Sequence, residues 1–185
     1  MLLWRIGAAV LGLAFSAPSE AQSDLENGFE GALRGCEQWV LEPATWSGGL
    51  DEFAAKLGDE AGWVQSVDDA ALPPKELRIA NHYLRINSTL NAGYILVVSD
   101  RVPFCHITGG GGTDLQPSVE AVLASGDFKS RWERVKDESK RGMTSTLFRN
   151  LEEPKLEIMI SRAKMPGERL DRVQVLATAD FDLGG

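Results

Sequence analysis

The chain has 185 residues, of which 43% are apolar and 25% are charged, and it carries a net charge of −8 at pH 7. This size and composition suit one globular domain with a hydrophobic core. The acidic balance argues against general nucleic-acid binding, which needs a positive surface.

The first 21 residues have the three parts of a secretory signal peptide. Arg5 supplies a positive charge, residues 6–15 form an apolar run, and Ser19-Glu20-Ala21 places small residues where a signal peptidase reads them. The run is too short to anchor the chain in a bilayer, which takes about 20 residues. We therefore expect an exported protein, periplasmic in a bacterium and secreted otherwise, with no transmembrane segment in the mature chain.

The mature part, residues 22–185, begins with two predicted helices, over residues 23–42 and 50–57. In the first of them, apolar side chains recur at spacings of three and four, which places them on one face. They are Leu25, Phe29, Ala32, Leu33, Cys36 and Val40. Three glycines in this helix weaken it by up to about 1 kcal/mol each, and they favour close contact with another element.

After a less regular stretch over residues 59–74, the apolar pattern alternates, which is typical of strands. Three strands are predicted in each half of the chain, over residues 76–86, 94–99 and 104–108, then 144–149, 156–162 and 172–180. Between the two triplets lie a run of glycines at 109–112, a helix over 117–124 and a charged segment over 127–141.

These elements predict a single α+β domain, residues 22–185, with the order ααβββα(α)βββ. Short links within each strand triplet favour antiparallel pairing. We expect an antiparallel sheet of about six strands with helices packed on one face. The two triplets are compatible with a structural duplication, although no repeat is visible residue by residue.

The two cysteines, Cys36 and Cys105, predict a disulfide bond. An exported chain meets an oxidising compartment, where paired thiols usually bridge. Since Cys36 lies on the apolar face of the first helix and Cys105 lies in a predicted strand, the bond would join helix to sheet.

The alternative for Cys105 is a thiol nucleophile activated by its neighbour His106. Adjacent residues on a strand point to opposite faces of the sheet, so the two side chains are not expected to form a dyad. The other histidine, His82, shares its strand face with Leu84 and Ile86 and is expected to be hydrogen-bonded and half-buried. No catalytic, cofactor-binding or metal-binding residues are assigned.

The glycines at 109–112 lie between a strand and a helix, where phosphate-binding loops occur. No complete nucleotide-binding motif accompanies them, so we expect a flexible connector, with a mobile lip around a binding cleft as the alternative.

Basic residues outnumber acidic ones in the segment 127–141. One interpretation is an amphipathic helix that docks Phe128, Trp132 and Val135 while mixed charges face water. The other is a contact surface for an anionic partner, such as an envelope polymer, a lipid headgroup or a protein. The residues that would make this contact are Lys129, Arg131, Trp132, Arg134 and Arg141.

Functionally, the sequence favours a non-catalytic exported domain that binds, assists or inhibits something in the cell envelope. The alternative is a small extracytoplasmic hydrolase whose site forms from residues scattered along the chain. A pocket that holds a histidine beside an acid or nucleophile would favour the hydrolase. An apolar patch or groove would favour the binding domain.

The small-residue site that ends at Ala21 predicts that the mature chain starts at Gln22. Mass spectrometry of the exported protein should find this N-terminus. An intact Met1 in the functional form would contradict both the cleavage and the export.

Overall fold

A computed structural model describes residues 20–42, 49–57, 61–140 and 142–181. The predicted signal peptide therefore lies outside the described residues, except for Glu20 and Ala21, which open the first helix. The α-helices are α1 (Glu20–Leu41), α2 (Leu50–Lys56), α3 (Gln116–Ala124) and α4 (Gly126–Arg131). Two short 3₁₀ helices are η2 (Asp69–Ala71) and η3 (Lys75–Leu77). The strands are β1 (Ala61–Val64), β2 (Asn81–Thr89), β3 (Ala92–Ser99), β4 (Phe104–Gly111), β5 (Trp132–Lys140), β6 (Met143–Asn150), β7 (Leu156–Ala163) and β8 (Val173–Phe181).

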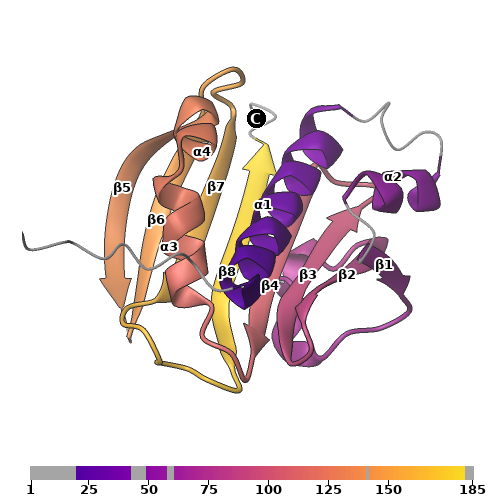
Figure 1. The fold of residues 1–185 in the computed structure, drawn as a ribbon. Coiled ribbons are helices and arrows are strands. Elements are labelled where there is room, and N and C mark those ends of the chain that lie inside the picture. Colours follow the sequence, from indigo (N-terminus) through magenta and orange to yellow (C-terminus); the bar gives the residue numbers. More distant parts are fainter. Residues whose placement is uncertain (1–19, 43–48, 58–60, 141, 182–185) are drawn as a thin grey trace, which may run out of the picture.

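The strands form one antiparallel sheet in the order β1-β2-β3-β4-β8-β7-β6-β5 (Figure 1). Each half of the chain contributes two helices and then a four-stranded meander, and the last strands of the two meanders pair at the centre. From either edge of the sheet, the strands therefore run inward in chain order, from the first strand of a meander to its last. This topology has the form of a structural duplication.

The mixed helix-and-sheet class was predicted correctly, but the sheet has eight strands in the described part of the chain and not six. The two strands that were not predicted are the edge strands of the sheet, β1 and β5. β1 is only four residues long and lies in a segment that shows no alternation. β5 is exposed on both faces beyond its first residue, so its polar sequence carries no strand pattern. The first strand of the earlier triplet also starts later than predicted, at Asn81, because Leu77 belongs to η3.

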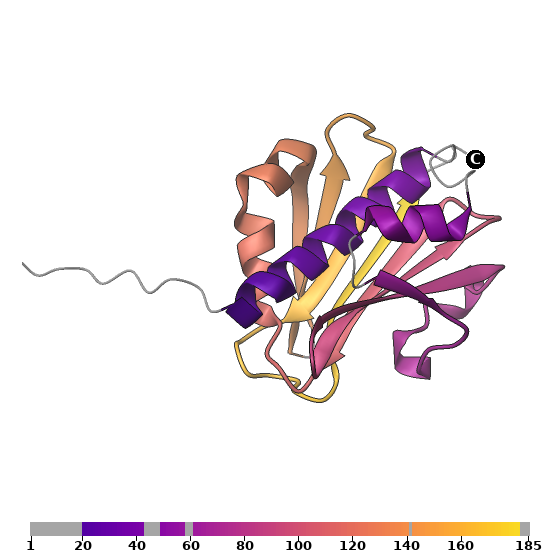
Figure 2. The same cartoon turned by 45° about the vertical axis from the view of Figure 1, so that its right-hand side comes forward.

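Helix α1 covers one face of the sheet, where it contacts β2, β3 and β4 and lies beside α3 (Figure 2). The predicted apolar face of this helix is the buried face. Two of its glycines permit the close approach to the sheet, since a Cβ on Gly35 would lie 3.1 Å from Leu96 Cδ2 of β3 and one on Gly28 would collide with the Ser88 hydroxyl of β2. The predicted close contact is confirmed.

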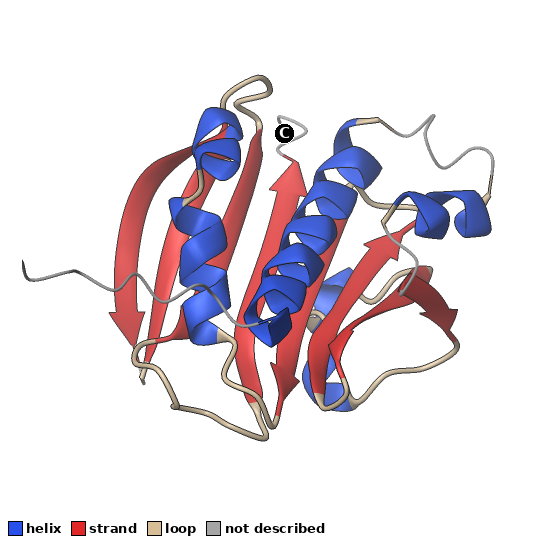
Figure 3. Ribbon diagram, in the orientation of Figure 1, coloured by secondary structure: helices blue, strands red, loops and turns tan. Residues whose placement is uncertain are grey.

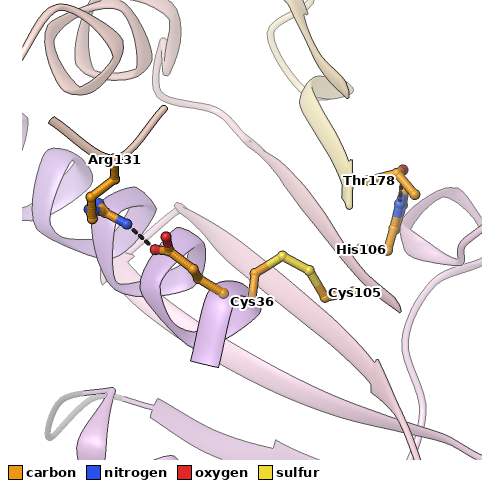
Figure 4. The surroundings of a disulfide bond; sticks show 6 residues. Cys36, Cys105, His106, Arg131 and Thr178 are labelled. Carbon is orange, nitrogen blue, oxygen red and sulfur yellow. Dashed lines mark hydrogen bonds and ion pairs between the residues drawn. A yellow bond between two sulfur atoms is a disulfide. The ribbon is translucent and has the colours of Figure 1, made fainter. Parts of the chain in front are cut away.

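The disulfide between Cys36 and Cys105 is present, with 5.4 Å between the two Cα atoms (Figure 4). It joins α1 to β4 and lies in the core, where both residues are at most 2% exposed. The bond closes a loop of 69 residues, which stabilises the fold by about 4 kcal/mol if the effect is loss of chain entropy in the unfolded state.

Because Cys105 points to α1, its neighbours Phe104 and His106 point to the opposite face of the sheet. We call this the outer face. Residues 68–78, which contain η2 and η3, cross it and are called the strap. The Thr108 hydroxyl donates a hydrogen bond to the Ala71 carbonyl of the strap, 3.3 Å away. In Figure 3 the short helices of the strap lie behind the strands, while α1 and α3 lie in front.

The glycine run is not a flexible connector, because Gly109, Gly110 and Gly111 belong to β4 and pair with both β3 and β8 or the turn before it. Close packing explains why glycine occupies these positions of β4. A Cβ on Gly109 would lie 2.5 Å from Val175 Cγ1 and 2.7 Å from Tyr94 Cδ1. Gly111 has φ of 130°, which other residues rarely adopt.

The substitution Gly109→Ala should therefore lower the free energy of unfolding by about 1–3 kcal/mol through overpacking. Gly62→Ala is the matched control, because Gly62 also lies in a strand and a Cβ there would meet nothing within 4 Å. Urea unfolding of both variants checks this. Equal stabilities would contradict the packing described for β4.

Candidate functional site

The charged segment predicted as one amphipathic helix is a short helix followed by an edge strand. α4 ends at Arg131, and Trp132 begins β5, which pairs with β6. The helical spacing arose because Phe128 and Trp132 pack on the same side although they belong to different elements. Val135, which was predicted to dock, is 40% exposed.

The structure brings three of the predicted contact residues together around one hollow of about 370 Å³, between α3, α4 and the β5–β6–β7 edge of the sheet. They are Lys129, Trp132 and Arg134. We call this the basic hollow; its other lining residues are Glu120, Leu123, Ala124, Phe128, Phe148 and Arg162. Of the remaining predicted residues, Arg141 lies outside the described residues, and Arg131 does not line the hollow.

Arg131 braces α4 against α1. Its guanidinium donates hydrogen bonds to Glu37 and, at 2.8 Å, to Asp127, while Asn150 donates to the same Glu37 at 2.7 Å. Figure 4 shows Arg131 beside α1, directed at this carboxylate. Burial raises the pKa of Glu37, against the opposing effect of Arg131. Arg131 is therefore part of the fold and is not a free contact residue.

Three aromatic rings form the apolar wall of the basic hollow. The Phe128 and Trp132 rings are nearly parallel with centroids 6.2 Å apart, and Phe148 meets Phe128 edge to face at 4.9 Å. All three residues are buried. The indole N–H of Trp132 has no hydrogen-bond partner among the described residues, although its nitrogen is buried.

A chain of polar contacts leads from Arg162 and Glu120, which line the hollow, to Thr146 and Asp137, which do not. Arg162 donates to Glu120 at 2.5 Å and to the Thr146 hydroxyl at 2.9 Å, and Thr146 donates to Asp137 at 2.7 Å. Arg134 donates two hydrogen bonds to Asp137 and, with Thr146, holds the pKa of that carboxyl below its usual range. The sequence offered no signal for Arg162 and Glu120, which come from a strand and a helix far apart in the chain.

Lys129 has no ion-pair partner among the described residues that surround it. The lining of the hollow holds three cations, Lys129, Arg134 and Arg162, and one carboxylate, Glu120, while Arg134 also pairs with Asp137 outside the lining. The hollow is a positive spot on a chain whose net charge is −8.

His106 lies on the outer face and is 4% exposed. Its Nδ1 is 2.8 Å from the Thr178 hydroxyl and its Nε2 is 3.1 Å from the Thr108 hydroxyl. Thr108 donates to the Ala71 carbonyl, so it accepts from Nε2–H, and Thr178 then donates to Nδ1. Burial lowers the pKa of His106 to about 4, so the ring is neutral at pH 7.

His106 lines a second hollow, of about 350 Å³, between the strap and strands β4, β7 and β8. We call it the strap hollow. Its remaining lining residues are Ala70, Leu72, Pro73, Pro74, Arg78, Met159, Ser161, Leu176 and Thr178. Cys105 takes no part in it, which confirms that Cys105 and His106 form no dyad.

A third and larger hollow, of about 660 Å³, lies on the other side of the strap. The glycines at 109–111 line it as part of strand β4. Its charged lining is balanced, with Arg85 and Arg172 set against Asp68 and Asp171. This balance gives no preference for a charged ligand.

His82 is half-buried and hydrogen-bonded, as predicted. Its Nε2 is 2.6 Å from Asp100 Oδ2, and its ring lies near Trp39 and Trp63. The imidazole thus packs as part of the α1–β2 contact.

Across the described residues, no group of three or more histidine, cysteine or acidic side chains is placed to hold a metal ion. In the same part of the chain, every helix is too short or too polar to cross a bilayer. Comparison with protein-family models, curated proteins and solved structures found no match. Function must therefore be inferred from the residues themselves.

The buried His106 predicts a specific dependence of stability on pH. Its pKa is about 4 in the folded chain and about 6.5 in the unfolded chain, so the unfolded chain binds a proton first. This contribution to stability is complete above pH 6.5 and is lost as the pH falls toward 4, by up to about 3 kcal/mol.

Urea unfolding between pH 7.5 and 4.5 should show a flatter stability curve for His106→Asn than for the unmodified mature protein. Parallel curves would contradict the buried, neutral imidazole. If the variant fails to fold, NMR titration of the His106 ring in the unmodified protein decides the same question.

Proposed function

We propose that this protein is an exported, non-catalytic binding domain of the cell envelope that takes an anionic partner at the basic hollow. One observation carries the proposal. Lys129, Trp132 and Arg134, from two different elements, converge with the buried Arg162 on a single concave site. A concave site that combines apolar walls with a few convergent polar groups is the usual form of a ligand site.

The charges of the hollow explain why an anion would be preferred. Lys129 is free to bind, and Arg162 has a third guanidinium nitrogen, Nη2, with no partner among the described residues. Arg162 is buried beside the aromatic rings, where a low dielectric strengthens its attraction for a negative group, whereas Lys129 is exposed.

A small hydrolase is the second candidate, and one observation favours it. The Thr178 hydroxyl lies 2.8 Å from His106 Nδ1 inside the strap hollow, which is the relation of a nucleophile to its base. Two features argue against a hydrolase. A pKa of about 4 makes His106 a poor base at neutral pH, and its Nε2 bonds a hydroxyl and not a carboxylate that would stabilise the charged ring.

Lys129→Glu combined with Arg134→Gln should weaken binding to the native partner by about tenfold or more at low salt and reduce the salt dependence of binding. Arg134 is largely exposed, so the melting temperature should change little. Lys155→Glu combined with Lys164→Gln makes the same change of charge at two exposed sites outside the hollow and should leave binding unchanged.

The measurement is recovery of partners from the native compartment, with the mature protein and the two double variants as baits, followed by salt elution. Equal recovery by all three baits would refute the basic hollow as the contact site. Ester turnover that disappears in Thr178→Val and in His106→Asn, with both variants folded, would favour the hydrolase over the binding domain.

A further inference from the structure

We propose that the strap hollow is a separate binding site for a small carboxylate with a short apolar chain, and that Arg78 binds the carboxylate. This site is independent of the basic hollow: it lies on the outer face of the sheet, whereas the basic hollow lies on the side of α3 and α4. The proposal rests on the anchoring of Arg78 by the strap, on the apolar walls and on the satisfied polar floor.

Arg78 is held in place by the strap itself. Its Nε donates to the Pro73 carbonyl at 2.8 Å, and its backbone N–H donates to the Lys75 carbonyl at 3.2 Å. With Nε engaged, the two terminal nitrogens remain, and neither has a partner among the described residues. This pair has the geometry that binds both oxygens of a carboxylate.

The walls of the hollow are apolar. Its apolar lining residues include Leu72, Pro73 and Pro74 of the strap, Met159 of β7 and Leu176 of β8. A volume of about 350 Å³ is near the lower end for ligand pockets, which span about 300–1,000 Å³. The hollow therefore suits a chain of a few carbon atoms better than a long acyl chain.

The polar groups in the floor are already satisfied by one another. His106 bonds Thr178 and Thr108, and the Ser161 hydroxyl lies 2.7 Å from that of Ser145. Polar groups that keep their hydrogen bonds can be covered by an apolar chain at little cost. Among the described side chains of this hollow, Arg78 is then the one charged group left to recognise a ligand.

The direct test uses hexanoate and its uncharged analogue hexanamide as probes of the mature protein. NMR should show hexanoate shifting the His106 ring and Met159 methyl signals, with hexanamide binding at least about tenfold more weakly, since a charge-assisted hydrogen bond contributes more than a neutral one. Arg78→Gln should weaken hexanoate binding by a similar factor. Arg85→Gln, which removes a cation of the large hollow beyond the strap, is the matched control and should bind hexanoate normally.

Equal affinity for the two probes, or normal hexanoate binding by Arg78→Gln, would overturn the proposal. The Lys129→Glu, Arg134→Gln double variant separates the two sites. It should keep its hexanoate affinity, whereas loss of that affinity together with shifts at the Trp132 indole would place the anion in the basic hollow and refute the strap site.

Discussion

The attachment of α1 to the sheet is the constraint on which the rest of the structure depends. Cys36 and Cys105 bond helix to strand at the centre of the core, and the glycines of α1 let the helix approach β2 and β3 closely. In this contact α1 covers one face of the first meander. Arg131 then links α1 to α4 through ion pairs with Glu37 and Asp127. Since α1 occupies that face, the hollows lie where it does not reach: on the outer face and beside α3 and α4.

Several parts of this architecture follow from the sequence because their signals are local. The apolar stripe of α1, the helix predicted over residues 117–124 and the inner strands depend on neighbouring residues, and each is present, although β2 starts later than predicted. The edge strands were not predicted. In β5, for example, both faces are exposed to solvent, and the mixed charges resemble those of an exposed helix. Such charges also protect the free edge of a sheet from pairing with another chain.

The candidate sites were harder to predict because their residues meet through long-range packing. Lys129, Trp132 and Arg134 are close in sequence and were identified, but Arg162, which completes the hollow, comes from β7. Thr178 lies 72 residues from the histidine it contacts. The separation of Cys105 from His106 was predictable, because it needs only the alternation of side chains along a strand.

Amide hydrogen exchange of the mature protein, oxidised and reduced, tests most directly whether the disulfide-anchored α1 organises the fold. If it does, reduction should lower protection in α1 and in β3, β4 and β8 together, since these elements form one packed unit. The outer strands β5 and β6 lack the extensive packing that α1 makes with β2, β3 and β4, although Asn150 at the end of β6 bonds Glu37 of α1, so these two strands should change less. Unchanged protection of α1 and β4 after reduction would show that the fold does not depend on the disulfide attachment of α1 to the sheet.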